Sequence, residues 1–452
     1  MAMGSGSPQD EGSLSKADQD APSTRRHHWR RNNEDIQRWA ELFKGGLTIV
    51  HIAERENVDP DTVSQQLHTL GLTVTQGHHM VQQLPLKYSS QFIELVDKGP
   101  DALLGFVKSR VWGIQASSTG EKQLQSFCAF VRLHHLGVGV KEMSRILSVH
   151  RSTVLHWRDG TDQPYLIRAA NDTLPFVPRT EWRMLPMHLV SGGSEPSGWI
   201  QVPEKIRSYS DVLDVINQTK PLEETFRRAG LFRLAKVQVQ EMRPELFAYQ
   251  LGIMVGDSGK LGGQQPRYSS MNLDLQLTQK QPTNERLGEF VMMCANSLGI
   301  QMERKRDKQP TGATAMGEHP SAAYRWASER SPLLAWMFSV GLGLSWAETT
   351  TTHQLRMDWI LDTPRLFRVR FVQGAADSDG CVKHTVEIAS VPNSQFFANV
   401  LQSLGVTSAH CGYEKGEPLK TVISLRQASS LPIFNEFVMS YRYQKLMSRN
   451  RA

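Results

Sequence analysis

Apolar residues recur at helical spacing near the start of the chain. The first predicted helix carries them at i, i+3, i+4 and i+7, as Ile36, Trp39, Ala40 and Phe43. Two glycines at 45–46 end this helix, and a second helix is predicted from Thr48 to Glu56. After a tight turn, Pro60 is well placed in the first turn of a third helix. Three short helices at this spacing predict a helix-turn-helix unit over residues 33–75.

The same pattern returns between residues 121 and 162. The first predicted helix there holds the apolar residues Leu124, Phe127, Phe130 and Val131. Glycines at 137 and 139 interrupt the pattern, a second helix follows to Leu147, and a third spans residues 152–157. We therefore predict a second helix-turn-helix unit over residues 121–162, joined to the first by a helical connector over residues 76–120.

Polar residues on the third helix of each unit are the candidates for contact with DNA. If Val154, Leu155 and Trp157 face inward, then Arg151, His156 and Arg158 face outward, toward base edges and phosphates. The corresponding helix of the first unit offers Ser64 and Gln65 but no Arg or Lys. A three-helix bundle is also a common protein-interaction module, so that alternative stays open for both units.

Two segments carry less pattern. Residues 1–32 are rich in Gly, Ser, Asp and Gln and end in a basic run, so we predict a disordered tail that is either solvated or a non-specific phosphate-binding arm. Residues 163–240 contain Pro and Gly-Ser stretches and two short helical patterns, at 210–216 and 222–229. We interpret them as a linker region of unclear fold.

Two apolar helices end in acidic residues. Residues 244–255 lead into Gly256-Asp257, and residues 366–376 lead into Asp377-Ser378-Asp379. Asp257 and Asp379 are 379 − 257 = 122 residues apart. Similar elements follow each helix, and the repeat indicates an internal duplication with a first module at 241–365 and a second at 366–449. After the second helix we expect a strand at 382–390, a helix at 393–404, a hairpin returning through 421–425 and a helix at 431–446.

Small residues one turn apart mark a face on each of these helices. Gly252 and Gly256 share a face of the first, and Gly374 and Ser378 share a face of the second. Such faces let two helix backbones pack closely, which would bring Asp257 and Asp379 together at the C-terminal helix ends. Two carboxylates beside the negative ends of two helix dipoles repel each other unless a cation lies between them. Hard oxygen ligands of this kind favour Mg²⁺.

The two segments resemble the paired motifs of single-chain LAGLIDADG homing endonucleases, over residues 241–449. The resemblance implies an α+β fold in which two αββαββα modules form a pseudo-twofold saddle on the DNA major groove, here preceded by all-α helix-turn-helix domains. It also implies a monomer, with Asp257 and Asp379 as the metal-binding catalytic acids and Asp377 as a structural acid. Two departures are the order Ser258-Gly259 and the small pair Ala375-Ala376 in place of bulkier residues.

The family also uses basic and amide groups on strands beside the metal. The candidates in this chain are Lys420, Arg325 as its counterpart, and Gln276, each of which could equally be a solvent-facing strand residue. Arg304, Lys305 and Arg306 form a basic run that we place in a hairpin loop, either as phosphate contacts or as a solvated charge run.

Composition changes this interpretation little. The 452 residues include 51 Lys and Arg against 45 Asp and Glu, a net charge of +6 that suits a phosphate-bearing partner without establishing one. The four cysteines form no CxxC pair, which favours a reducing compartment. The N-terminal residues lack the apolar core of a signal peptide, and glycines interrupt the longest apolar run, at 331–347. We expect no membrane association and a cytoplasmic, nucleoid-associated protein.

These features favour a site-specific, Mg²⁺-dependent endonuclease that hydrolyses phosphodiester bonds in both strands of double-stranded DNA. A non-cleaving transcriptional regulator with the same fold is the main alternative, and an RNA-splicing maturase is a third. Retention of both Asp257 and Asp379 favours cleavage, because a regulator would be free to lose either acid.

Overall fold

The computed structural model describes two compact units, one formed by Met1–Gln82 with His135–Val138 and one by the rest of the chain. The units are treated separately below. The described residues are 33–44, 47, 49–70, 72, 88–190, 195–256, 267–280, 283–308, 322–382, 385–407, 409–414, 417–424 and 426–427. Within these ranges, none of the helices has the length and apolar character needed to cross a membrane.

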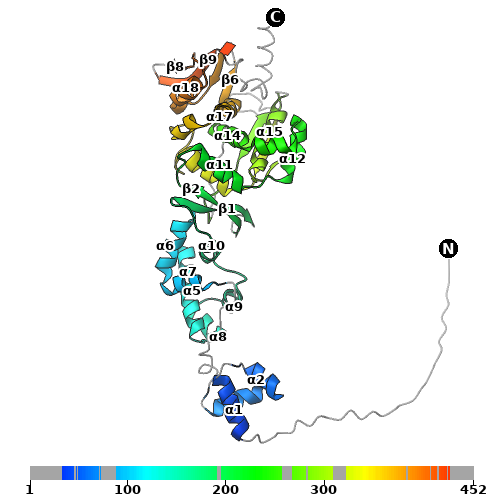
Figure 1. Cartoon of the computed structure of the whole chain (residues 1–452), viewed down its shortest axis with the longest axis vertical. Coiled ribbons are helices and arrows are strands. Elements are labelled where there is room, and N and C mark those ends of the chain that lie inside the picture. Colours follow the sequence, from blue (N-terminus) through cyan, green and yellow to red (C-terminus); the bar gives the residue numbers. More distant parts are fainter. Residues whose placement is uncertain are drawn as a thin grey trace, which may run out of the picture. The chain divides into compact units, whose positions relative to one another are not determined.

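The first unit is a small helical core. It contains α1 (Asn33–Lys44), α2 (Ile49–Glu56) and α3 (Pro60–Thr69), in agreement with the predicted helices (Figure 1). Its buried side chains are Trp39, Ala40, Phe43, Ile52, Ala53, Val63 and Leu67. Asp59 caps α3 by accepting a hydrogen bond from the backbone N–H of Asp61, which explains why this helix begins at Pro60.

The second unit begins with six further helices. They are α5 (Ser90–Asp97), α6 (Pro100–Arg110), α7 (Ser118–His135), α8 (Val140–Leu147), α9 (Arg151–Asp159) and α10 (Tyr165–Thr173). Phe127 and Phe130 of α7 pack edge-on against Trp157 of α9, with ring centroids 5.6 and 5.7 Å apart. Ser148 turns the chain between α8 and α9 with a left-handed backbone, φ 52°. This arrangement leaves one face of α9 exposed.

Residues 163–240, interpreted from the sequence as a linker region, form regular structure. Besides α10 they contain β1 (Trp182–Val190), β2 (Glu195–Pro203), α11 (Tyr209–Gln218), α12 (Glu223–Ala229), η1 (Gly230–Phe232) and α13 (Lys236–Glu241). β1 and β2 pair antiparallel, and their side chains Leu185 and Val202 are fully buried in the main core. Pro186 and Pro196 lie inside these strands, which is tolerated because each strand has a partner on one side only. The prolines and the nearby glycines therefore gave this hairpin the composition of a linker.

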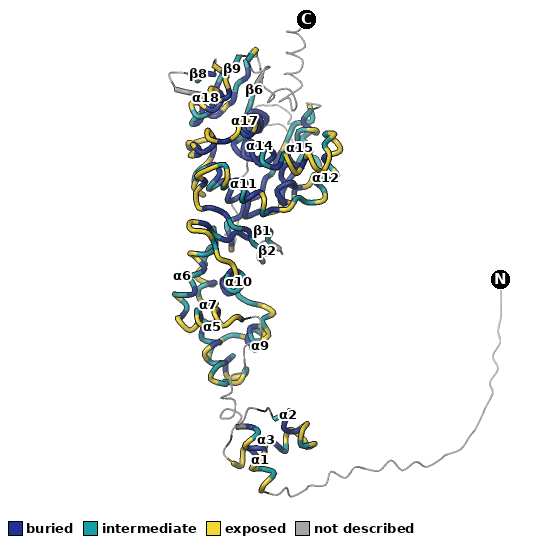
Figure 2. The backbone as a smooth tube through the Cα atoms, in the orientation of Figure 1, coloured by how far each residue is buried: buried dark blue, intermediate teal, exposed yellow. Residues whose placement is uncertain are grey.

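Two long helices lie at the centre of the main core, α14 (Arg243–Gly256) and α17 (Arg365–Asp379). Their contact is the most extensive between any two described helices, and most of both helices is buried (Figure 2). A Cβ built on Gly252 would overlap the carbonyl oxygen of Phe371 and lie 2.6 Å from the backbone nitrogen of Ala375. A Cβ on Gly374 would lie 3.0 Å from the backbone nitrogen of Ile253. The predicted close approach of the two backbones is confirmed.

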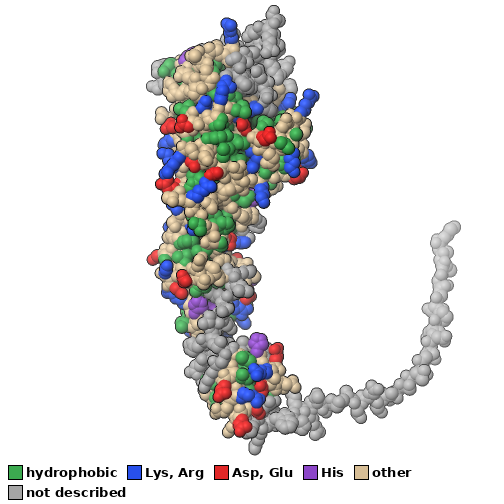
Figure 3. Space-filling view, in the orientation of Figure 1, with side chains coloured by type: hydrophobic (Ala, Val, Ile, Leu, Met, Phe, Trp, Pro, Cys, Tyr) green, Lys and Arg blue, Asp and Glu red, His purple; other side chains and the backbone are tan. Residues whose placement is uncertain are grey.

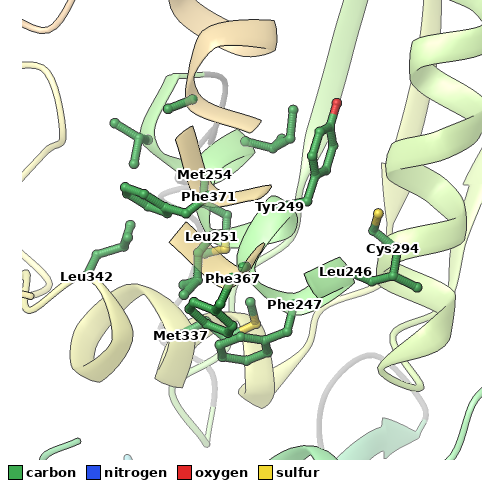
Figure 4. Packing of buried hydrophobic residues seen from close by; sticks show 14 of the residues in the cluster. Leu246, Phe247, Tyr249, Leu251, Met254, Cys294, Met337, Leu342, Phe367 and Phe371 are labelled. Atoms are coloured by element: carbon green, nitrogen blue, oxygen red, sulfur yellow. The ribbon is translucent and has the colours of Figure 1, made fainter. Parts of the chain in front are cut away.

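Large apolar side chains surround this helix pair. Figure 4 shows Leu246, Phe247, Leu251 and Met254 of α14 among side chains contributed by several other elements. The neighbours labelled there are Cys294 of α15, Met337 of η2, Leu342, and Phe367 and Phe371 of α17. The pair is therefore held both by backbone contact along its axis and by burial of a wide apolar surface around it.

Each of the two central helices is followed by an antiparallel sheet and further helices. After α14 come β3 (Asp274–Thr278), α15 (Thr283–Ser297), β4 (Met302–Arg304), β5 (Ala323–Ser328), α16 (Pro332–Trp336), η2 (Met337–Gly341) and η3 (Asp358–Asp362). After α17 come β6 (Gly380–Val382), β7 (Thr385–Ile388), η4 (Val391–Asn393), α18 (Ser394–Ser403), β8 (His410–Glu414) and β9 (Glu417–Ser424).

The strand orders of the two sheets correspond. The first sheet has the order β3-β5-β4 and the second β6-β7-β9-β8, so three strands of the second repeat the order of the first. The single strand predicted at 382–390 is instead two antiparallel strands, in which Val382 pairs with Val386. No Gly, Pro, Asn or Asp lies between these two valines to signal a turn. The predicted helix at 431–446 lies outside the described residues.

The glycine contact gives a direct test of the central helix pair. Replacing Gly252 with Ala places a methyl group against backbone atoms of α17, which cannot rotate away as a side chain would. We expect Gly252→Ala to lower the free energy of unfolding by about 3 kcal/mol or more. Gly105→Ala is the matched control, because Gly105 lies exposed in α6 with open space around it, and there Ala should add about 0.5–1 kcal/mol. Urea unfolding followed by circular dichroism measures both, and equal midpoints would contradict the close packing.

Candidate functional site

The C-terminal ends of α14 and α17 lie against each other. A Cβ built on Gly256, the last residue of α14, would lie 2.7 Å from Cβ of Ser378 and 3.0 Å from Cβ of Asp379. Asp379 is the last residue of α17, and its carbonyl oxygen accepts a hydrogen bond from the backbone N–H of Ala389 at 3.1 Å. Asp257 follows Gly256 directly in the sequence and lies outside the described residues. The structure thus shows one predicted acid in contact with the residue that precedes the other.

The carboxyl group of Asp379 is poorly solvated. It is about half-buried, and this burial raises its pKa above the ordinary aspartate value. Among the described residues, none forms an ion pair or a side-chain hydrogen bond with it. A carboxylate at a helix C-terminus also faces the negative end of the helix dipole. Each of these effects disfavours the charged form, so the surroundings described here favour a cation beside Asp379.

A second acid, Asp377, lies inside the interface of α14 and α17. The hydroxyl group of Tyr249 on α14 donates a hydrogen bond to Oδ2 of Asp377 at 2.8 Å. Both side chains are buried, and burial raises the pKa of Asp377 well above its usual range, while the nearby charge of Arg370 opposes this shift. Asp377 is thus a structural contact between the helices. The sequence identified the acid but not its partner, because nothing in an apolar helical pattern distinguishes Tyr249 from a packing aromatic.

The first sheet presents its candidate residues on one face. Gln276 of β3 is the direct cross-strand partner of Arg325 of β5. The Arg325 guanidinium donates to both carboxylate oxygens of Asp274, at 2.9 and 2.6 Å. The ammonium group of Lys308 donates to Oε1 of Gln276 at 3.4 Å. Trp326, the next residue along β5, is buried against Gly288 of α15, so Gln276 and Arg325 lie on the face turned away from that helix.

Lys420 lies on the corresponding face of the second sheet. Its Nζ is 2.9 Å from Oε1 of Glu387, so its charge is balanced by an acid on the neighbouring strand. The adjacent Thr421 points the other way and donates to the carbonyl oxygen of Ser394 on α18 at 2.6 Å. Thr421 also pairs with Ile388, and Ile388 pairs with Gly380, the residue after Asp379. Gly380, Ile388 and Thr421 thus lie side by side on three neighbouring strands, starting next to the end of α17. Lys420 is one residue away from this row.

The basic run at 304–306 is not in a hairpin loop. Arg304 ends β4 and lies over the rings of Tyr324 and Trp326, 5.0 and 5.8 Å from their centroids, on the face covered by α15. It forms an ion pair with Glu285 of α15. Lys305 forms an ion pair with Glu303, and its backbone N–H donates to the carbonyl oxygen of Arg325 on β5 at 2.8 Å. Arg306 lies between this hydrogen bond and the pairing of Lys308 with Ala323. The prediction of a hairpin loop was wrong for Arg304. Through the stem and the charge of its side chain, Arg304 attaches the first sheet to α15.

Acidic and basic side chains are interspersed on the molecular surface. In Figure 3, Lys and Arg side chains alternate with Asp and Glu over the face of the second unit that is shown. The ion pairs of Arg325, Lys420 and Arg304 are local examples of the same mixing. On the candidate strands, each of these three cations therefore lies beside an acid.

The candidate DNA-binding residues on α9 and α3 differ in exposure. Arg151 and His156 of α9 are exposed, while Val154 and Trp157 are buried. The ring Nδ1 of His156 lies 3.0 Å from the hydroxyl of Thr161. Arg158 is half-buried and forms an ion pair with Asp159 at 2.9 Å. In the first unit, Gln65 is exposed and Ser64 is half-buried on α3.

A divalent cation fits the residues at the helix ends. Asp379 offers a desolvated carboxylate with no compensating charge among the described residues. The described part of the chain contains no group of three or more His, Cys, Asp or Glu side chains placed to hold a metal. Mg²⁺ commonly binds one or two carboxylates and completes its shell with water and phosphate oxygens, so a full protein cage is not needed.

The buried acid gives a pH-dependent test. Because the pKa of Asp377 is raised in the folded state, the unfolded chain loses this proton at a lower pH than the folded chain does. Below about pH 4 the buried position of Asp377 does not lower the free energy of unfolding. As the pH rises from there toward the folded-state pKa, the free energy of unfolding falls. Asn at this position still accepts from Tyr249, so Asp377→Asn should gain stability relative to the wild type as the pH rises above about 4.

Urea midpoints across a pH series measure this effect, with Asp101→Asn, an exposed acid in the first turn of α6, as the control for loss of one charge. Tyr249→Phe should lower stability by about 1–3 kcal/mol, since it leaves a buried acceptor without its donor. Parallel pH curves for the wild type and Asp377→Asn would contradict the buried state of this acid.

Comparison with known proteins gives partial structural likenesses. No family model and no curated protein matches the sequence. I-DmoI in complex with DNA and Mn is 16% identical, with a TM-score of 0.30 over 44% of this chain and 99% of its own. I-DmoI with DNA and Ca gives a TM-score of 0.29 at 16% identity over 42% and 87%. The homing endonuclease I-WcaI, bound to its DNA recognition sequence, gives 0.27 at 10% identity over 48% and 94%. At these values the likeness assigns neither a family nor an activity to the chain.

Proposed function

We propose that this protein binds double-stranded DNA and cleaves it with a divalent metal ion held at the ends of α14 and α17. The observation that carries the proposal is the contact of Gly256 with Asp379, which brings the C-terminal ends of two glycine-faced helices together. Consecutive Cα atoms are about 3.8 Å apart, so Asp257 can lie only a short distance from this contact. The sequence resemblance to paired LAGLIDADG motifs supports the same assignment, with residues 241–365 and 366–449 as a duplicated αββαββα module.

Asp257 and Asp379 are the residues that would hold the metal. Mg²⁺ bound there would supply charge neutralisation for phosphate oxygens and a more acidic water for phosphodiester hydrolysis. The chain itself contributes position: the hydrogen bond from Ala389 to Asp379 fixes the end of α17, and the Tyr249–Asp377 contact fixes the helix pair laterally. Burial at the end of α17 also limits the access of bulk water to Asp379.

The sheet faces turned away from α15 and α18 are the proposed surfaces for the duplex. Gln276, Arg325 and Lys420 lie on these faces, and their side-chain types donate hydrogen bonds to base edges and phosphates. Asp274 and Glu387 balance the two cations in the absence of DNA. Phosphates would compete with these acids for Arg325 and Lys420. The two helix-turn-helix units, through Arg151, His156 and Arg158 on α9 and through Ser64 and Gln65 on α3, would add affinity or specificity.

Cleavage is tested by selecting cut sites from a randomised duplex library in the presence of Mg²⁺. The wild type should cut selected sites, and chelation of the metal should abolish cutting. Asp257→Asn and Asp379→Asn should each lower the cleavage rate by at least about a hundredfold while duplex binding is retained. Asp362→Asn removes an exposed acid on η3 and serves as the control. A wild type that binds a specific duplex and leaves it intact with every divalent metal would establish a non-cleaving regulator instead.

The acids on the sheet faces give a second test. Glu387→Gln releases Lys420 and removes a negative charge facing the proposed duplex surface, so duplex affinity should rise by about 1 kcal/mol, roughly fivefold. The duplex affinity of this variant should also fall more steeply with rising salt concentration. Glu285→Gln is the matched control, since its partner Arg304 lies on the face covered by α15. Equal effects of the two variants, measured by fluorescence anisotropy with a labelled duplex, would argue against the assigned faces.

A further inference from the structure

A cavity lies between α7 and α9 in the second unit, apart from the helix ends described above. Its volume is about 490 Å³. Residues from the first turns of α7 and from the start of α9 line it, together with Trp157 of α9. Its principal polar lining residues are Lys122, Ser126, His150, Thr153, Asp162 and Arg267. Neither the paired acids nor the candidate strand residues belong to this cavity.

The lining offers several hydrogen-bond donors, and its cations outnumber its acids. Lys122 and Arg267 bring two cations, and Asp162 is the single acid among the lining residues. The hydroxyl groups of Ser126 and Thr153 can donate as well. α9 adds the positive end of its dipole, because the cavity includes His150, the residue that precedes its first turn. The summed field and the donor set favour an anion with several oxygens.

The side chain of His150 caps α9 in this wall. Its Nδ1 accepts a hydrogen bond from the backbone N–H of Ser152 at 3.3 Å and lies 2.6 Å from the Ser152 hydroxyl. An Nδ1 that accepts from a backbone N–H carries no proton, so the neutral ring is protonated at Nε2. The cap of α9 therefore leaves His150 with a donor on its other ring nitrogen.

Arg267 is positioned from outside the helix-turn-helix unit. Its guanidinium lies over the ring of Tyr165, 5.2 Å from the centroid. Its backbone carbonyl accepts a hydrogen bond from the N–H of Gln115 at 3.0 Å. Among the described residues, neither Arg267 nor Lys122 forms an ion pair with an acid. Arg267 is placed by its contact with Tyr165, and Lys122 is exposed on α7, so both cations are available to a ligand.

We propose that this cavity is a phosphate-binding site that holds a backbone phosphate of duplex DNA beside α9. The proposal rests on duplex binding as inferred above. It adds residues from outside α9 to that contact: Lys122 from α7, and Arg267, which lies 267 − 257 = 10 residues after Asp257. A phosphate in this site would be contacted both by the helix-turn-helix unit and by the chain that leads from the first acidic motif. The same donor set suits the phosphate group of a free nucleotide, and the experiment separates the two sources.

The test uses the full chain and a labelled duplex of random sequence, titrated by anisotropy over a range of salt concentrations. Lys122→Gln with Arg267→Gln should weaken binding roughly tenfold. It should also reduce the magnitude of the slope of log K against log salt by about 1, the change for one phosphate contact. Lys98→Gln with Arg233→Gln is the control, because it removes the same charge from two exposed positions outside the cavity.

Inorganic phosphate, followed by ³¹P NMR, is the second probe. Saturable phosphate binding that is lost in the double variant supports the site independently of DNA. His150→Asn tests the site without removing a Lys or an Arg. Asn keeps the helix cap but removes the Nε2 donor, so this variant should weaken phosphate binding.

Each combination of results supports or overturns the proposed phosphate site. Duplex binding that weakens in the double variant beyond the control supports the proposal. If duplex binding is unchanged in the double variant, while the wild type binds inorganic phosphate and the double variant does not, the DNA assignment is overturned in favour of a free phosphate compound. Duplex binding equal to the control together with no phosphate binding overturns the site altogether. A wild type that binds no duplex would instead refute the proposed function, and the phosphate titration would still decide whether the cavity binds an anion.

Discussion

Direct backbone contact between α14 and α17 is the constraint on which the rest of the main core depends. At Gly252 and Gly374 the atoms that meet across the interface belong to main chains. Contact between main-chain atoms therefore sets the helix separation more than side-chain packing does. The first sheet follows the end of α14 in the chain, and β6 begins directly after α17. Because both sheets are connected to these helix ends, the spacing of the pair determines how the candidate faces can be presented.

The close approach also brings polar groups into a dry interior. Gln250 and Gln373 are completely buried, and neither polar atom of the Gln250 side chain has a hydrogen-bond partner among the described residues. One oxygen of Asp377 is also without a partner there. Groups of this kind cost stability when they are buried. The wide apolar surface around the pair offsets this cost, which suggests that the polar residues are kept for position and not for stability.

Local patterns in the sequence predicted much of this fold. The helices of both small bundles follow from periodic apolar residues, and the glycine faces of α14 and α17 follow from small residues one turn apart. What escaped prediction depends on contacts between distant residues. The β1–β2 hairpin contains prolines that a paired interior strand would not accept, and the hairpin of β6 and β7 has no turn signal.

The candidate site shows the same division. The position of Asp379 at the end of α17 was predictable, because a motif and its neighbours lie within one short segment. The partner of Asp377 was not, because Tyr249 is 128 residues away in the chain. The position of Arg304 depends on which face of β4 meets α15, and a one-residue change of strand register would have reversed it. The cavity between α7 and α9 joins Lys122 to Arg267 through the tertiary fold alone.

The glycine contact also limits how this protein can change over generations. A clash between two side chains can be relieved by trimming either one, so a harmful substitution usually has many second-site suppressors. A methyl group at position 252 would meet a carbonyl oxygen and an amide nitrogen, and no substitution elsewhere shortens a main chain. Genetic screens for suppressors should therefore return reversion at that position, while the surrounding apolar positions accept compensating pairs.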